Sequence, residues 1–355
     1  MRDWLRILLG AIAVIAMMEL LLRALPVSTG LSYQASSAQN PVVRGKPNLD
    51  YTYSSGWNLR MVQHGHLNNF GFPAVDDYDP NAPNIIVVGD SYVESLMLRP
   101  ADRLQVRLEQ QLHHLVRVYG IGRSGSNLAQ KLGAAKWAFS VFRPKVVIIN
   151  LNDTDVASSL TSPAGDFYFS LRDKKCELLR TERPPEGLIG NLVRSSMLYH
   201  YLTANLRITV TLRHIFGGGE TALWQLYAPE SAPIRARIAA CVIQLLPELI
   251  HLPPERVIFV IGSDLDGVYG SLPARELDID PVTAALELAG YQVVRSDPIF
   301  RKDYAIYHMP LSFRPVDDHW NARAQALVAA AVAARVGPLL IGAAHDMHDN
   351  TLPRR

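Results

Sequence analysis

A serine and a histidine lie in two polar blocks that are far apart in the chain. Ser91 comes directly after the apolar run Ile85 to Val88 and the pair Gly89-Asp90, and His319 stands in the block Asp317 to Asn321. A serine hydroxyl is a weak nucleophile at neutral pH, so it needs a base from elsewhere in the fold within hydrogen-bond reach. The two blocks therefore predict acyl-group chemistry through a covalent intermediate on Ser91, with His319 as the base.

Two further residues could stabilise the negative charge that develops in such a reaction. Gly125 lies in the segment Gly120 to Asn127, and Asn152 directly follows the apolar run Lys145 to Leu151. Each preorganised donor at an oxyanion is worth about 2.7 to 4 kcal/mol. We expect the backbone amides of Ser91 and Gly125 and the side-chain amide of Asn152 to form this oxyanion hole. A glycine suits position 125 because backbone that approaches a ligand closely leaves no room for a side chain.

A carboxylate must orient the histidine. On the second ring nitrogen it would fix the tautomer and stabilise the imidazolium. Asp317 and Asp318 are both near enough in sequence, and we expect Asp317 to fill the role, with Asp318 as the alternative.

The tripeptide Gly89-Asp90-Ser91 has a simpler interpretation when it is taken alone. It could be a strand-to-helix turn in which Asp90 or Ser91 caps the helix. The nucleophile elbow of alpha/beta-hydrolases, G-x-S-x-G, is excluded because Val93 stands two residues after Ser91.

Strands and helices alternate along the chain that carries these blocks. Apolar runs predict buried strands, and leucines and alanines at helical spacing predict the helices between them. The expected strands are 85–88, 115–119, 145–151, 256–262 and 291–295, and the expected helices are 101–116, 127–142 and 320–336. This alternation predicts a three-layer α/β fold with a doubly wound parallel sheet. Ligands of such sheets bind beyond the carboxyl ends of the strands, where Ser91 falls.

The order of the blocks resembles that of the SGNH (GDSL-type) hydrolase superfamily. Its four name-giving residues match Ser91, Gly125, Asn152 and His319. The resemblance covers about residues 84–336, and the lead-in Leu67 to Phe72 is similar to the N-x-x-G-F approach of membrane-anchored bacterial members. One departure is that Val316 stands where the family commonly has its aspartate, three residues before the histidine. Some bacterial members, including those related to alginate acetylation, have Asp-x-His-Trp, which favours Asp317.

The resemblance implies a serine-dependent ester hydrolase, of the carbohydrate esterase or deacetylase kind, that uses no cofactor and no metal. The implied substrate is an acylated glycan or a small ester. Two alternatives stay open: an O-acetyltransferase that modifies a cell-surface polysaccharide, and a non-catalytic glycan-binding protein that keeps the fold. We place hydrolysis first because nothing in the sequence identifies an acceptor.

The N-terminus, Met1 to Pro26, predicts a membrane anchor. Residues 4–25 are long enough to cross about 30 Å of hydrocarbon if the charges at the ends snorkel. Glu19 and Arg23 are four residues apart and can pair on one helix face. We expect a signal anchor with the catalytic domain in the periplasm or outside the cell; a cleaved secretory signal is the alternative.

The rest of the chain divides around the catalytic domain. We expect a lead segment at 27–80, the catalytic domain at 81–336 with an insertion at about 157–253, and a loose tail at 337–355. The insertion is expected to shape the acyl or acceptor site, with Tyr199, Tyr201 and Trp224 available to stack on sugar rings.

Charge and cysteine content exclude some functions. The formal net charge of +2 gives no reason to expect nucleic acid as a partner. The two cysteines exclude a four-cysteine zinc site, and Cys176 and Cys241 are either bonded to each other or both reduced. The oligomeric state is left open.

Overall fold

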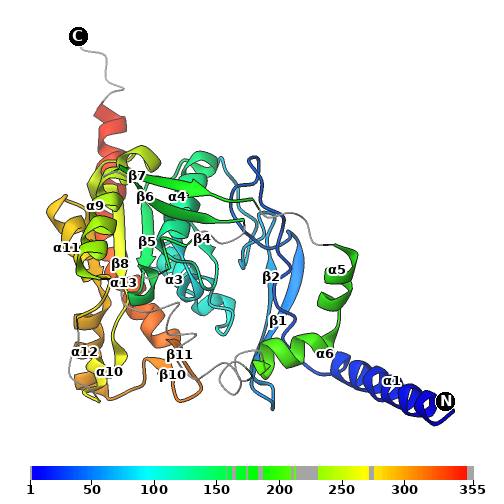
Figure 1. The fold of residues 1–355 in the computed structure, drawn as a ribbon. Coiled ribbons are helices and arrows are strands. Elements are labelled where there is room, and N and C mark those ends of the chain that lie inside the picture. The colour runs from blue at the N-terminus through cyan, green and yellow to red at the C-terminus, as the bar shows by residue number, and fades with distance from the viewer. Residues whose placement is uncertain are drawn as a thin grey trace.

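A computed structural model gives the structure of the chain (Figure 1). It describes residues 2–349 except 157, 162–164, 173–174, 183–186, 209–211, 213–230 and 272–275.

A parallel sheet of five strands forms the centre of the molecule, which confirms the predicted fold class. Its strands are β3 (Asn84–Gly89), β4 (Arg117–Gly122), β5 (Val147–Leu151), β8 (Val257–Ile261) and β9 (Gln292–Arg295). Their order across the sheet is β4-β3-β5-β8-β9. From β3 the chain first forms β4 on one side, and it then forms β5, β8 and β9 in turn on the other side. The direction in which the chain builds the sheet therefore reverses between β3 and β5. Ligands of doubly wound sheets bind at this switch point, which is where Ser91 and Asn152 follow their strands.

Helices cover both faces of the sheet. One face is covered by α4 (Leu128–Phe142), α9 (Ala232–Leu249) and α11 (Asp280–Leu288). The other face is covered by α3 (Leu104–Gln111), α10 (Leu265–Tyr269), α12 (Ser296–Tyr307) and α13 (Ala322–Asp349). Strands β3, β5 and β8 are buried along their whole length because both of their faces meet these helices.

Shorter elements connect the layers and carry the site. They are α2 (Ser91–Glu94), η1 (Pro100–Asp102), η2 (Asp153–Asp155), η4 (Pro254–Arg256), β10 (Ser312–Phe313) and β11 (Asp317–Trp320).

Helix α13 differs from the sequence expectation at its C-terminal end. Residues 337–349 were expected to form a loose tail, and in the structure they continue the helix. The first half of α13 lies in the core, where Ala324, Val328 and Val332 are fully buried. This packing stabilises the helix, which then continues beyond the domain. Residues 350–355 lie outside the described part of the chain.

The lead segment packs against the edge of the sheet. It contains an antiparallel hairpin, β1 (Leu49–Ser55) and β2 (Arg60–Leu67). The Tyr78 ring stacks on Tyr119 at 4.2 Å. The Tyr78 hydroxyl accepts from Gly120 N at 2.9 Å and donates to Gly120 O at 3.0 Å. These bonds satisfy main-chain groups of β4 that an exposed sheet edge would leave unpaired.

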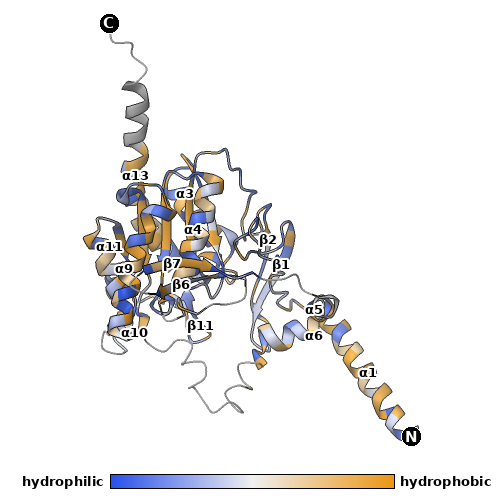
Figure 2. Cartoon of the chain, turned by 45° about the horizontal axis from the view of Figure 1, so that its top comes forward, coloured by the Kyte–Doolittle hydropathy of each residue, from blue (hydrophilic) through white to orange (hydrophobic). Residues whose placement is uncertain are grey.

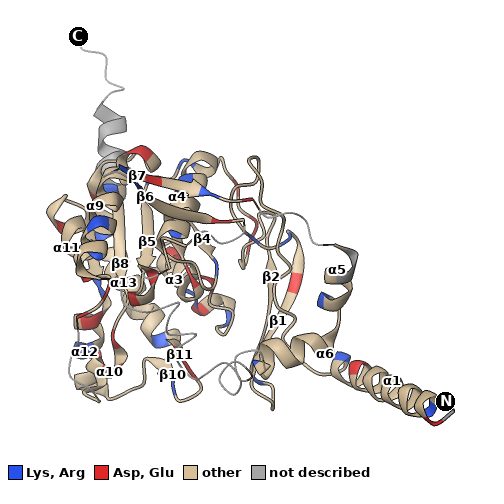
Figure 3. Cartoon of the chain, viewed as in Figure 1, with Lys and Arg blue, Asp and Glu red and all other residues tan. Residues whose placement is uncertain are grey.

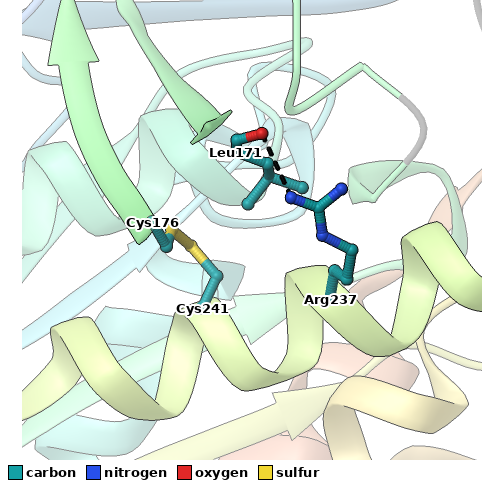
Figure 4. Close-up of a disulfide and its surroundings, with 4 residues drawn as sticks. All are labelled: Leu171, Cys176, Arg237 and Cys241. Atoms are coloured by element: carbon teal, nitrogen blue, oxygen red, sulfur yellow. Dashed lines mark hydrogen bonds between the residues drawn. A yellow bond between two sulfur atoms is a disulfide. The ribbon is translucent and has the colours of Figure 1, made fainter. Parts of the chain in front are cut away.

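The insertion separates into parts with different neighbours. Strands β6 (Phe167–Arg172) and β7 (Lys175–Arg180) form a hairpin that contacts α4 and α9. Cys176 on β7 is disulfide-bonded to Cys241 on α9 (Figure 4), which decides between the two alternatives for the cysteines. Helix α9 itself belongs to the core, so the part of the insertion that departs from the sheet is shorter than expected and ends before Ala232.

The other part of the insertion lies beside the N-terminal helix. Helix α1 (Arg2–Arg23) extends away from the sheet, and α5 (Leu188–Arg194) and α6 (Met197–His200) lie near its C-terminal end (Figure 1). A π-helical turn, η3 (Tyr201–Asn205), follows α6. The surface of α1 is almost entirely apolar (Figure 2), and charged residues occur only near its two ends (Figure 3).

Candidate active site

Ser91 and His319 meet at the carboxyl end of the sheet. Ser91 is the first residue of α2, and His319 lies on the short strand β11. His319 Nε2 is 2.6 Å from Ser91 Oγ, so the ring nitrogen is in position to accept the hydroxyl proton. Trp320 is buried against Tyr92 and Phe300, with ring centroids 4.9 Å and 5.5 Å away, and this packing holds β11 over the sheet.

The second ring nitrogen of His319 contacts Asp317. Asp317 Oδ1 is hydrogen-bonded to His319 Nδ1 and also accepts the backbone N–H of His319 at 2.8 Å. Asp318 points elsewhere: its side chain is 71% exposed and forms an ion pair with Arg314. Alternating side chains on a strand face opposite sides, so of these two neighbours Asp317 lies on the side of His319.

The Asp317 carboxylate is stabilised in its charged form. Burial acts to raise its pKa, but the hydrogen bonds from His319 and the positive charge of Arg207 outweigh burial and lower the pKa below the ordinary value. A charged Asp317 favours the imidazolium that forms when His319 accepts a proton.

Asn152 and Gly125 lie on the same cleft as Ser91 and His319. Asn152 Nδ2 donates to Asp90 Oδ2 at 2.6 Å, and it has a long contact of 3.3 Å with Asn150 Oδ1. Of its two amide hydrogens, the one directed at Asn150 therefore has the weaker bond. Gly125 has φ +75°, a left-handed conformation that favours glycine, and no atom would meet a Cβ at this position. The backbone conformation therefore favours glycine at this position, in addition to the close approach to a ligand that was expected from the sequence.

The structure thus brings all four blocks to the switch point of a doubly wound sheet. These are the four blocks on which the resemblance to the SGNH hydrolases was based.

No protein-family model matches the sequence, and no curated protein does. Several solved structures are similar at low identity, and some of them are named as esterases. TesA is 16% identical, with 72% of this chain and 99% of that chain covered and a TM-score of 0.39. Est24, a carbohydrate acetylesterase from Sinorhizobium meliloti, is 12% identical, with 72% and 99% covered and a TM-score of 0.36. A catalytic mutant of Axe2, an acetylxylan esterase from Geobacillus stearothermophilus, is 15% identical, with 72% and 94% covered and a TM-score of 0.37. Similarity at this level says nothing about the substrate of the present chain.

A buried lysine lies beneath the candidate site. Lys131, on α4, has no exposed surface, and its ammonium donates to Asp90 Oδ2 at 2.8 Å and to Asp155 Oδ2 at 2.6 Å. Asp155 Oδ2 also accepts the backbone N–H of Asn152 at 2.8 Å. Asp90 caps α2 by accepting from Tyr92 N at 2.9 Å. Lys131 therefore connects the turn that carries Ser91 with both the side chain and the backbone of Asn152.

The charges of this cluster do not cancel. Two buried carboxylates, Asp90 and Asp155, share the single positive charge of Lys131. Burial raises the pKa of Asp155 to about 7, and the negative charge of Asp90 adds to the shift while Lys131 opposes it.

Two further residues fix the loop before Gly125 and the side chain of Asn152. Glu94, a buried residue of α2, accepts from the backbone N–H of Ser124 at 3.1 Å and from its hydroxyl, which fixes the loop that leads to Gly125. Burial raises the pKa of the Glu94 carboxyl. A Cβ on Gly262 would lie 2.1 Å from Asn152 Oδ1, so only glycine leaves room for the Asn152 amide.

Sequence reasoning missed Lys131, Asp155, Glu94 and Gly262 as parts of the candidate site. A lysine in the expected helix 127–142 and a glycine directly after the apolar run Val257 to Ile261 were the available signals.

The cleft around Ser91 has a volume of about 570 Å³, and most of the residues that line it are polar. Six aspartates line it together with Arg314: Asp90 and Asp155, and the four of the rim, Asp153, Asp264, Asp266 and Asp318. Leu265 and Leu277 are its aliphatic side chains. Arg314 pairs with Asp266 and Asp318, so its charge is already neutralised within the rim.

Two of the three aromatic residues that were expected to stack on sugars, Tyr199 and Tyr201, do not line this cleft. The Tyr201 hydroxyl donates to Trp57 O at 2.9 Å, and Tyr199 lies on α6, beside α1. Neither residue is in the cleft lining, which corrects the expectation for both; Trp224 falls outside the described residues. Within the described chain, the insertion contributes Ser158 to the lining and the charge of Arg207 near Asp317.

Proposed function

We propose that the protein is a serine ester hydrolase held at a membrane, with Ser91 as nucleophile, His319 as general base and acid, and Asp317 as the orienting carboxylate. The observation that carries this proposal is the continuous hydrogen-bonded series from Ser91 Oγ through the His319 ring to Asp317, at a cleft that Gly125 and Asn152 also line. A glycan-binding protein without catalysis would have no need of a base 2.6 Å from a serine hydroxyl.

The reaction follows from this geometry. His319 Nε2 accepts the Ser91 proton as Oγ attacks the ester carbonyl, and the oxyanion takes hydrogen bonds from the backbone amides of Ser91 and Gly125 and from Asn152. His319 then gives its proton to the departing alcohol, leaving the acyl group on Ser91. A water molecule, deprotonated by His319, releases the acid and restores the Ser91 hydroxyl.

The polarity of the cleft supports a short acyl group on a hydroxyl-rich alcohol. Carboxylates such as Asp153 and Asp264 can accept hydrogen bonds from sugar hydroxyls. A long acyl chain would need a larger apolar surface than Leu265 and Leu277 offer. The proposed substrate is therefore an acetylated glycan or a small ester.

Two observations support an exported, membrane-held protein. Helix α1 is long and apolar enough to span a bilayer, and large apolar side chains along it, such as Leu8 and Leu20, are more than half exposed. Part of α13 passes the same test, but that helix is packed on the sheet. The Cys176–Cys241 disulfide is typical of an oxidising compartment.

The test is to give the purified full-length protein acetylated oligosaccharides and nitrophenyl esters of graded chain length, and to measure acetate, free acid and acetylated sugar. We expect acid release that falls as the acyl chain lengthens. Acetylation of an added oligosaccharide faster than acetate release would replace hydrolysis by O-acetyl transfer. No turnover of any ester, with the fold intact, would reject the proposal.

A further inference from the structure

The N-terminal helix is joined to the insertion by a set of polar contacts. The Glu19 carboxylate accepts from Ser196 Oγ at 2.8 Å, from Met197 N at 3.0 Å and from Leu198 N at 2.9 Å. Arg23 pairs with Glu19 at 2.7 Å and donates to Ser195 O at 3.0 Å. The start of α6 is therefore fixed at the level of Glu19 on α1.

These contacts define the depth of α6 if α1 spans a bilayer. The 22 residues of α1 rise about 33 Å, close to the hydrocarbon thickness of about 30 Å. Glu19 is one helical turn, about 6 Å, further into the span than Arg23. An ionisable side chain at that depth is costly unless protein groups satisfy it, and α6 supplies three donors to Glu19. The first turn of α6 must then lie below the surface level that Arg23 marks.

An apolar groove continues the contact deeper along α1. It has a volume of about 410 Å³ and lies between Ile12, Ile15 and Ala16 of α1 and Leu192 and Leu198 of the insertion. From Arg23 to Ile12 the helix rises about 16 Å, so the groove reaches about halfway through a bilayer.

The helix α5 exposes apolar side chains beside this groove. Leu192 is 72% exposed, and its neighbour in sequence, Val193, is 43% exposed. Leu192 adjoins Ile12 and Ile15 across the groove, and these are 53% and 55% exposed. The exposed apolar side chains of α5 continue the apolar surface of α1. Exposure of such a surface to water costs free energy, whereas contact with hydrocarbon does not.

We infer that α5 and the start of α6 lie within the leaflet on the catalytic side of the membrane, with Leu192 and Val193 among lipid acyl chains. This inference rests on the part of the proposed function that places α1 across a bilayer. The partner is lipid, because the exposed surface of α5 is continuous with that of the spanning helix. The segment that follows then connects the membrane to the domain: Asn205 accepts from Ser28 N at 3.1 Å and donates to Ser54 Oγ on β1 at 2.8 Å.

The test uses single cysteines carrying an environment-sensitive fluorophore. The chain has two cysteines and both are in the disulfide, so an introduced cysteine is the sole free thiol. The full-length protein would be labelled at Leu192→Cys, at Leu9→Cys within α1, and at Leu288→Cys on α11, which is 90% exposed. Each would be placed in phosphatidylcholine vesicles with and without spin-labelled lipids that quench at shallow or deep positions.

We expect the label at 192 to shift to the blue and to lose emission to the spin-labelled lipids, as the label at 9 does, and the label at 288 to change little. In Glu19→Gln, the label at 192 should lose part of its quenching while that at 9 keeps it. Quenching at 9 with none at 192 would overturn the inference and leave the anchor standing. A blue shift at 192 without lipid quenching would show that protein covers the groove, for example a second copy. Absence of quenching at 9 would reject the anchor and the inference with it.

Discussion

Lys131 Nζ and Asn152 Nδ2 donate to the same carboxylate oxygen, Oδ2 of Asp90, at 2.8 Å and 2.6 Å. The proposed oxyanion donor is therefore oriented by an ion pair whose carboxylate, Asp90, lines the cleft and whose lysine is buried beneath it. Because Asp90 also caps the helix that begins at Ser91, one buried charge fixes nucleophile and oxyanion donor relative to each other.

Removal of the buried ammonium should reduce both stability and turnover. Lys131→Met leaves Asp90 and Asp155 without a positive partner, and loss of one member of a buried pair costs about 3 to 5 kcal/mol. Urea unfolding would measure the stability, and kcat would report the misplacement of Asn152. Lys136→Met, on the exposed side of the same helix, is the control. If Lys131→Met loses stability but keeps the parental kcat, the lysine is structural only.

Replacement of the nucleophile should abolish turnover without unfolding the protein. Ser91→Ala removes the atom that forms the acyl-enzyme, so neither ester hydrolysis nor labelling by a fluorophosphonate should occur. Ser140→Ala, in α4, should behave like the parent because its hydroxyl only donates to Trp137 O. Parental turnover in Ser91→Ala would end the serine mechanism.

The two neighbouring aspartates should differ strongly. Asp317→Asn removes the charge that orients His319, a change that costs about 10⁴-fold in kcat in serine proteases with a Ser-His-Asp triad. Asp318→Asn removes one partner of the exposed Arg314 and should change kcat little. Steady-state kinetics of the two variants decide the point, and a larger loss at Asp318 would show that Asp317 does not orient the histidine during turnover.

Loss of the Asn152 amide should lower kcat more than it raises KM. Asn152→Ala removes one oxyanion donor, for which we expect about 10²- to 10³-fold. Gly262→Ala should reproduce part of this loss, because its methyl group would meet Asn152 Oδ1 at 2.1 Å. Parental kcat in both variants would mean that the backbone amides alone hold the oxyanion.

The free energy of unfolding should depend on pH through the ionisation of Asp155. Its pKa is raised from 3.8 to about 7 in the folded protein, so between these values the folded state binds more protons than the unfolded chain. The contribution of Asp155 to the free energy of unfolding therefore falls as the pH rises from about 4 to about 7. Urea unfolding of the parent and of Asp155→Asn across this range should show the parent losing stability relative to the variant. A difference that is constant with pH would contradict the raised pKa.

The sequence by itself was sufficient for the sheet and for the four blocks. Fully apolar runs such as Ile85 to Val88 and Val147 to Ile149 can be satisfied in a sheet covered on both faces, and each run ends in the polar residues of a block. Since parallel strands all end at the same edge, the polar residues after β3 and β5 had to come together.

Only the tertiary structure decided which side chains complete the site and where the insertion lies. Hydrophobic periodicity indicates which face of a helix is buried, but it does not identify the partner of a buried polar group, so Lys131 gave no sign that it would meet Asp90 and Asp155. The insertion contains aromatic residues, and composition could not show whether they bind sugar or lie near α1. The location of the insertion depends on contacts between residues far apart in the chain, such as Glu19 with Ser196. These contacts form only when the whole chain is folded.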